Sequence, residues 1–196
     1  MKKLKLKNLS LLVLFLTSYI PLFGLLILRQ IKQNKDYLHF SSFEKTNIII
    51  AFQKFGLTYF LILLIFFGLF GVYILFTNFE SRIKNGDLVK ITDIENKNSE
   101  AIGYISTYIV PFIFQDTNDF FDLTSLVIVL IIIFLIYSKS NMIVINPILN
   151  ITHSLYQIEF SQNGIKKKGM LITKIDEIDE NQEITINQIS NNIFYG

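Results

Sequence analysis

Long apolar stretches separated by short polar connectors occupy the chain up to residue 141, and an alternating apolar–polar pattern follows them. The stretch at residues 56–77 contains no charged residue. At about 1.5 Å rise per residue, about 22 residues form a helix of roughly 33 Å, which is long enough to cross the hydrocarbon core of a bilayer. A surface helix of a soluble protein carries a polar face, and this stretch has none. We therefore predict an integral membrane protein.

Three further stretches complete a predicted set of four transmembrane helices. Residues 9–28 follow several lysines and lack a small-residue cleavage site, so we expect an uncleaved first span, kinked at Pro21. Residues 122–138 are almost purely aliphatic and form the last span. Residues 101–115 are apolar but short, and they either cross with a tilt or form a re-entrant loop. We favour crossing, because four spans then place both termini in the cytoplasm, which agrees with the distribution of basic residues. Residues 47–52 either extend the second helix backwards or lie along the interface.

Small and polar residues within these spans are candidates for helix packing or for lining a pore. Gly68 and Gly71 share nearly the same face of the second long stretch, where glycine permits close helix approach. The third stretch contains Ser106, Thr107 and Tyr108, followed by Pro111. Hydroxyl groups in a membrane hydrogen-bond between helices or face a water-filled path. Both uses remain open from the sequence.

The part of the chain after residue 141 has the period of two that half-buried strands show. Strands are expected at 142–146, 149–160, 168–175 and 183–189, with a turn at Asn163-Gly164. A further short strand at 88–94 is expected in the loop after the second span. The fold class is therefore an α-helical membrane domain at 1–141 followed by a small β-rich cytoplasmic domain at 142–196. A β-domain of about 50 residues is marginal alone, so we expect it to lean on another subunit or a partner.

The basic residues predict the orientation in the membrane. With both termini in the cytoplasm, 13 of the 18 Lys and Arg residues lie inside, and the other five lie outside. These five are Arg29, Lys32, Lys35, Lys45 and Lys54. The formal net charge of the chain is +2, which is too small to indicate a large face for binding nucleic acid.

Composition argues against an enzyme. Of 196 residues, 51% are hydrophobic and 17% are charged, with a mean hydropathy of +0.45 and no cysteine. The two histidines, His39 and His153, have no spacing that suggests a metal site, and no phosphate-binding or hydrolase motif is present. The acidic loop with Asp116, Asp119 and Asp122 fits a solvated connector better than a lipid-phosphate site. We expect no cofactor, no metal and no catalytic residue.

The layout resembles one family of bacterial membrane proteins. A lysine-flanked first helix, four short spans and a small β-rich tail resemble the KwaA family, the membrane component of the Kiwa anti-phage defence system. The residues that carry the resemblance are 98–112 (NSEAIGYISTYIVPF) and Asn146-Pro-Ile-Leu149 leading to Tyr156. These are not catalytic signatures, so the resemblance rests on the layout of nearly the full chain.

The resemblance implies an oligomeric inner-membrane sensor and scaffold, for which a tetramer is plausible. In that family a cytoplasmic DNA-binding partner, KwaB, acts against phage DNA, so this chain is not expected to bind nucleic acid directly. The alternative hypothesis is a homo-oligomeric pore or permeabilising effector, suggested by the polar third stretch. A third hypothesis is an assembly subunit of an unrelated envelope complex.

Overall fold

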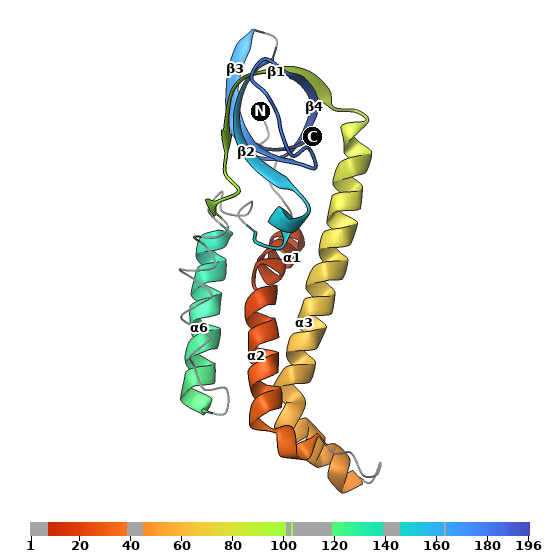
Figure 1. Cartoon of the computed structure of the whole chain (residues 1–196), viewed down its shortest axis with the longest axis vertical. Helices are drawn as coiled ribbons and strands as arrows, with labels where there is room; N and C mark the ends of the chain where they lie inside the picture. Colours follow the sequence, from red (N-terminus) through yellow and green to blue (C-terminus); the bar gives the residue numbers. More distant parts are fainter. Residues whose placement is uncertain (1–7, 39–44, 101–102, 104–118, 139–145, 163) are drawn as a thin grey trace.

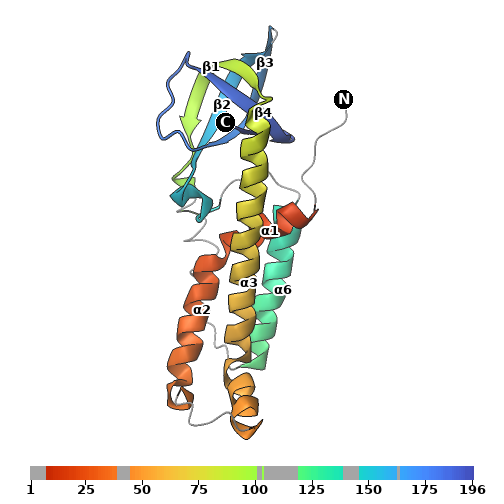
Figure 2. The same ribbon diagram turned by 90° about the vertical axis from the view of Figure 1, so that its right-hand side faces the viewer.

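A bundle of helices carries a β-barrel at one end (Figure 1). The structure is a computed structural model that describes residues 8–38, 45–100, 103, 119–138, 146–162 and 164–196. A view turned by 90° shows the same arrangement, with α3 reaching the barrel and α2 and α6 beside it (Figure 2). The chain is therefore divided into a helical half and a barrel half, which meet at the end of α3.

The first predicted span is broken into two helices. α1 covers Asn8–Ser18 and α2 covers Ile20–Gln33, and their axes differ by 52°. Pro21 lies in the first turn of α2, where its missing N–H costs no hydrogen bond. The predicted kink near Pro21 is confirmed, but the expected single helix at 9–28 is wrong, because the break at Tyr19 separates two helices and α2 runs on to Gln33. A short 3-10 turn, η1 at Lys35–Tyr37, follows.

The longest helix, α3 at Lys45–Ile83, contains the predicted span 56–77 and extends beyond both of its ends. Its 39 residues correspond to about 58 Å, roughly twice the thickness of a hydrocarbon core. Residues 47–52 extend this helix backwards, which decides between the two alternatives for them. The last predicted span is found as α6 at Phe120–Tyr137, where Asp119 caps the helix by accepting from the backbone N–H of Phe121 at 2.7 Å.

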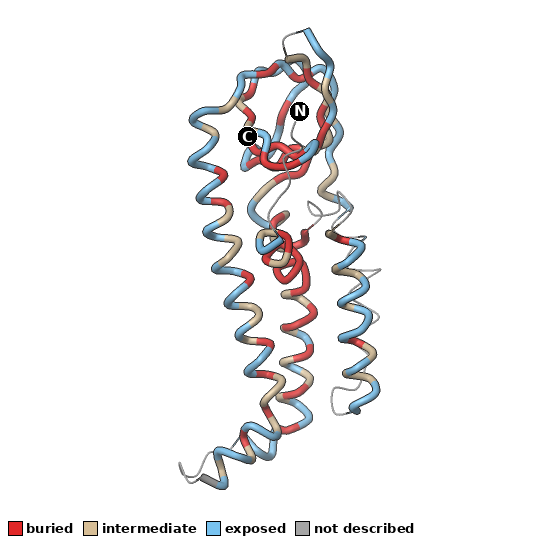
Figure 3. The backbone as a smooth tube through the Cα atoms, turned by 180° about the vertical axis from the view of Figure 1, so that it is seen from behind, coloured by how far each residue is buried: buried red, intermediate tan, exposed pale blue. Residues whose placement is uncertain are grey.

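The helices α3 and α6 are each long and apolar enough to cross a membrane, and the bent pair α1–α2 is a third candidate. Figure 3 shows exposed positions along most of α3 and α6, whereas α1 is largely buried. Large exposed apolar side chains on a helix surface fit a lipid environment. Four spans are not established by these helices, because the predicted span 101–115, apart from Gly103, lies outside the described residues.

Five strands close into a barrel in the order β1-β2-β3-β5-β4. They are β1 at Asp87–Asn96, β2 at Ser154–Gln162, β3 at Ile165–Thr173, β4 at Glu183–Ser190 and β5 at Ile193–Tyr195. All neighbours are antiparallel except β3 and β5, which run parallel. This is the strand order of the five-stranded Greek-key barrel known as the OB-fold. A closed barrel leaves no long unpaired sheet edge.

The barrel extends beyond the β-rich domain predicted at 142–196. β1 corresponds to the strand expected at 88–94, yet it pairs with β2 on one side and β4 on the other. The predicted boundary at residue 142 therefore omits one of the five strands. The strand expected from residue 149 begins at Ser154, because Leu149–Ile151 form a 3-10 turn, η4. Residues 142–145 lie outside the described ranges.

Two apolar clusters form the core, and one of them holds the two halves together. One fills the barrel and includes Val89 and Ile91 of β1. The other joins the helices to the lower rim of the barrel, which contributes Ile172 and Tyr195. The hairpin expected at Asn163-Gly164 is confirmed, since Gln162 pairs with Ile165 and Gly164 adopts φ +77°. The cluster inside the barrel is therefore distinct from the cluster that joins the barrel to the helices.

Candidate functional site

Glycines allow α1 to lie against α3. A Cβ atom added at Gly71 would fall 2.6 Å from Val13 Cγ2, and one added at Gly68 would fall 3.3 Å from Thr17 Cγ2. Real Cβ atoms do not approach other carbons to 2.6 Å, so any larger residue at Gly71 would push the two helices apart. The structure therefore places both predicted glycines at one interface, and their partner is the N-terminal helix of the same chain.

A buried asparagine fastens the segment after α6 to α1. Asn146 is fully buried, and its Nδ2 donates to the carbonyl oxygen of Leu14 at 3.0 Å and to Thr17 Oγ1 at 2.8 Å. Its Oδ1 accepts from the backbone N–H groups of Ile148 and Leu149 at 3.0 and 3.4 Å. An amide buried among apolar side chains is tolerated because its polar atoms are hydrogen-bonded. These bonds fix the approach of the chain to β2.

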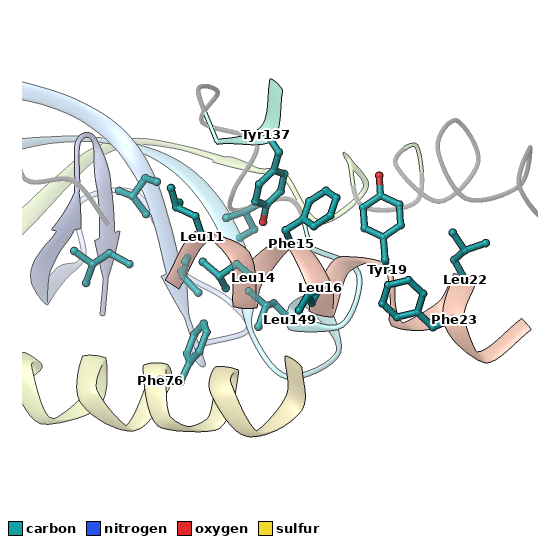
Figure 4. Close-up of a cluster of buried hydrophobic side chains, with 14 of the residues drawn as sticks. Leu11, Leu14, Phe15, Leu16, Tyr19, Leu22, Phe23, Phe76, Tyr137 and Leu149 are labelled. Atoms are coloured by element: carbon teal, nitrogen blue, oxygen red, sulfur yellow. The ribbon is translucent and has the colours of Figure 1, made fainter. Parts of the chain in front are cut away.

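Aromatic side chains fill the contact between α3 and the barrel. The ring centroid of Phe76 lies 4.5 Å from that of His153 and 5.6 Å from that of Tyr195. Phe79, almost one turn further along α3, lies 5.8 Å from Tyr195. Figure 4 shows Phe76 projecting from α3 toward the cluster that also holds Leu149. Ring pairs at these distances stabilise a contact beyond the apolar area they bury, so the end of α3 and the barrel form one packed unit.

Polar groups surround this aromatic contact. Glu80 of α3 forms an ion pair with Lys174, which follows β3, at 2.5 Å. His153 has both ring nitrogens engaged, with Nδ1 at 2.8 Å from Thr152 Oγ1 and Nε2 at 3.3 Å from the Tyr195 hydroxyl. Asn187 of β4 adds a bond from Nδ2 to the carbonyl oxygen of Arg82 at 3.2 Å. We refer to this region, where α3 meets the barrel, as the helix–barrel junction.

Burial shifts two ionisable groups at the helix–barrel junction. Burial lowers the pKa of His153, and the positive charge of Lys174 lowers it further, while Glu80 acts in the opposite direction. Burial and the negative charge of Glu80 together raise the pKa of Tyr195 to about 12. Both groups are therefore neutral at pH 7, which suits their place in an aromatic cluster.

The lowered pKa of His153 predicts a pH dependence of stability. Below about pH 6.5, the reference pKa of histidine, His153 is protonated in the unfolded chain but stays largely neutral in the folded chain until a lower pH. The free energy of unfolding should then fall as the pH drops through this value. Thermal unfolding of the full chain in detergent at pH 7.5 and 5.5 measures the effect, with His153→Gln as the comparison. An identical decrease in Tm for both proteins would contradict the prediction.

The structure describes two of the six residues that the sequence singled out. Gly68 and Gly71 lie together at the α1–α3 contact, whereas Ser106, Thr107, Tyr108 and Pro111 lie outside the described residues, as do His39 and Asp116. Within the described ranges, no group of three or more His, Cys, Asp or Glu residues is placed to hold a metal ion. His153, expected on a strand surface, instead contacts Phe76.

Sequence reasoning missed the contact of Asn146 with α1 and the ion pair of Glu80 with Lys174. The Asn-Pro pair at 146–147 is a turn signal, but it gives no hint that the asparagine side chain points into α1. Glu80 and Lys174 are 94 positions apart. Their pairing depends on how α3 and the barrel meet, which no local pattern encodes.

Comparison with known protein families identifies one family whose model matches most of the chain. The model of the anti-phage protein family KwaA matches residues 10–195. The chain belongs to the KwaA family. The match runs from α1 to β5, so the helices and the barrel are both part of what KwaA proteins share. No curated protein and no solved structure gives a significant match. Membership implies a role in defence against phage and places this protein among the components of an anti-phage system.

Proposed function

We propose that this protein is the membrane-embedded sensor and scaffold of an anti-phage complex, that it has no catalytic role, and that it recruits a cytoplasmic DNA-binding partner resembling KwaB. The observation that carries the proposal, beyond family membership, is the continuity between α3 and the barrel. Only Lys84, Asn85 and Gly86 separate the end of α3 from the start of β1. A rigid helix joined so closely to a barrel strand passes its displacement to the barrel.

The barrel supports the proposed topology in the bacterial inner membrane. Because β1 pairs with β2, residues 87–96 and 154–162 lie on the same side of any membrane. An even number of crossings must then separate them, and α6 supplies one. This supports residues 101–115 as a further crossing and four crossings in all. Since the basic residues favour the barrel side as cytoplasmic, we propose that both termini lie in the cytoplasm.

The surface of the barrel supports the proposal that the partner, and not this chain, binds DNA. OB-fold barrels that bind single strands stack bases on exposed aromatic rings. Here the strand aromatics Tyr156, Phe160, Phe194 and Tyr195 are all buried. On the outer face, Lys168 forms an ion pair with Glu159 at 2.9 Å. The described strands thus offer no exposed aromatic ring for stacking, so this barrel fits a protein partner better than a single-stranded nucleic acid.

The proposal is tested by identifying what copurifies with the full chain, extracted gently from its native host. Mass spectrometry should find a soluble nucleic-acid-binding protein in near-stoichiometric amount. A chain lacking Gln162–Gly196, which loses β3, β4 and β5, should stay in the membrane fraction but lose both the partner and phage protection. Recovery of the chain alone as a homo-oligomer would contradict the proposal. It would favour the pore hypothesis, for which ion flux from liposomes is the measurement.

A matched pair of point variants removes the ambiguity of a large deletion. Ile91→Asp places a carboxylate inside the barrel, whereas Leu88→Asp places one on the exposed side of the same strand. The first should abolish partner recovery and protection, and the second should retain both. Equal protection by the two variants would show that the folded barrel is not needed, which overturns the scaffold role.

A further inference from the structure

A cavity of about 530 Å³ opens between α3 and the chain entering the barrel. Its lining changes character along α3, from apolar Leu69 and Val72 to charged Glu80. These positions span 11 residues, or about 17 Å along the helix axis. With the uncharged stretch 56–77 taken as the membrane span, the apolar end falls within the hydrocarbon core and Glu80 falls at the level of the headgroups. The cavity therefore follows the polarity gradient of one leaflet.

The charged end of the cavity presents one positive and one negative group. Lys174 Nζ and Glu80 Oε1 are 2.5 Å apart, and their side chains keep 62% and 45% of their accessible surface. Glu80 also has a side-chain hydrogen bond with Tyr195. The ammonium has three N–H donors, and the two carboxylate oxygens offer about four lone-pair sites, so these contacts still leave donors and acceptor sites for a ligand. A purely anionic headgroup would meet Glu80, and a purely cationic one would meet Lys174. A zwitterion satisfies both.

The other polar groups around the cavity are engaged within the protein. Thr77 Oγ1 donates to the carbonyl oxygen of Tyr73 at 2.9 Å. Thr152 Oγ1 contacts His153 Nδ1 at 2.8 Å and also donates to the carbonyl oxygen of Leu149 at 3.3 Å. These residues form the wall, and Glu80 and Lys174 are left as the groups that select a headgroup.

We infer that this cavity binds one phospholipid with a primary ammonium headgroup, phosphatidylethanolamine, from the leaflet on the barrel side. Its phosphate accepts hydrogen bonds from Lys174, and its ammonium donates to Glu80. A choline headgroup has no N–H to donate to a carboxylate, so it makes a weaker contact there. The acyl chains begin near Phe76 and extend along Val72 and Leu69 into the bilayer. The lipid thereby lies at the helix–barrel junction, where membrane and barrel meet.

The inference is tested on the full chain in mild detergent by native mass spectrometry. The probes are dioleoyl phosphatidylethanolamine and dioleoyl phosphatidylcholine in an equimolar mixture. One phosphatidylethanolamine should be retained per chain, with a preference of about two- to fivefold over phosphatidylcholine, as expected for one solvent-accessible charged contact. Equal retention of the two lipids by the unmodified chain would overturn the inference, and this comparison does not depend on any variant.

Variants locate the site. Glu80→Gln should remove the preference between the two lipids, and Lys174→Gln should lower the retention of both. Matched controls come from the ion pair of Glu159 with Lys168 at 2.9 Å, which lies on the barrel away from the cavity and has similar exposure. Glu159→Gln and Lys168→Gln should leave retention unchanged. If Glu80→Gln and Glu159→Gln retained the two lipids in the same ratio, the preference for phosphatidylethanolamine would arise elsewhere on the protein. That result would overturn the assignment of the lipid to this cavity.

Two further measurements distinguish a lipid held in this cavity from a soluble headgroup or a lipid bound elsewhere. Val72→Phe should reduce retention by filling the apolar end, whereas glycerophosphoethanolamine, which has no acyl chains, should not displace the lipid at equal concentration. Displacement by this soluble headgroup would contradict a membrane lipid as the ligand. Retention is measured without phage or partner, so the lipid site can fail while the proposed defence role holds, and the reverse is equally detectable.

Discussion

Ile91→Ala is expected to lower the free energy of unfolding of the barrel by about 2–5 kcal/mol, the range for removing a large buried aliphatic side chain. Ile91 is 0% exposed and packs inside the barrel with residues from the C-terminal strands. The change leaves a cavity at the strand that closes the barrel between β2 and β4. Hydrogen–deuterium exchange of the amides in β2 and β4, in the full chain in detergent, measures the loss.

Leu88→Ala is the matched control, because Leu88 lies on the same strand and is 65% exposed. An exposed substitution of this kind changes stability by less than about 0.5 kcal/mol. Exchange in β4 should therefore accelerate strongly in the first variant and hardly at all in the second. If both variants exchanged alike, β1 would not be a structural member of the barrel.

Gly71→Ala is expected to destabilise the helical half by about 1–3 kcal/mol, as overpacking does in a close-packed contact. The added methyl would fall within 2.6 Å of Val13 Cγ2, so α1 must move away from α3. Thermal unfolding of the full chain in detergent should show a lower Tm. A fall in Tm would be opposite to the intrinsic effect of the substitution, because alanine in place of glycine normally stabilises a helix by about 1 kcal/mol.

Two companion variants isolate the steric cause. Gly56→Ala lies on the same helix with no atom within 4 Å of the new methyl, so it should leave the Tm unchanged or raise it. Val13→Ala combined with Gly71→Ala should recover part of the loss, because the double variant restores room at the contact. Destabilisation by Gly56→Ala of the same size, or no recovery in the double variant, would show that crowding at the α1–α3 contact is not the cause.

The sequence predicted those elements whose information is local. The uncharged stretch inside α3 specifies a long helix, the alternation at 88–94 specifies a strand, and Asn163-Gly164 specifies a hairpin, because each depends on neighbours along the chain. The position of Gly68 and Gly71 on one face was also readable. Their partner was not, since nothing in α3 indicates that α1 of the same chain, and not a second copy, lies against it.

The missed features depend on contacts between distant parts of the chain. β1 pairs with β2 across more than 50 residues of intervening chain, and the alternating pattern of β1 is the same whether it joins the barrel or stays in a loop. The break at Tyr19 is similar. Proline indicated a bend, but the size of that bend follows from packing α1 under the barrel, where Asn146 holds it. Local patterns in the sequence thus identified individual helices and strands, but they did not determine which of these elements contact one another.

The proposed topology, in which membrane segments lie between β1 and β2, would order the events of synthesis. The ribosome releases β1 long before its neighbours β2 and β4, and in this topology α6 enters the membrane in between. If α6 entered in the wrong direction, β2 to β5 would emerge on the far side of the bilayer and β1 would remain alone, with its apolar side chains and both edges exposed to proteases and chaperones. In this topology the barrel closes only in a chain whose α6 has entered the membrane in the correct direction.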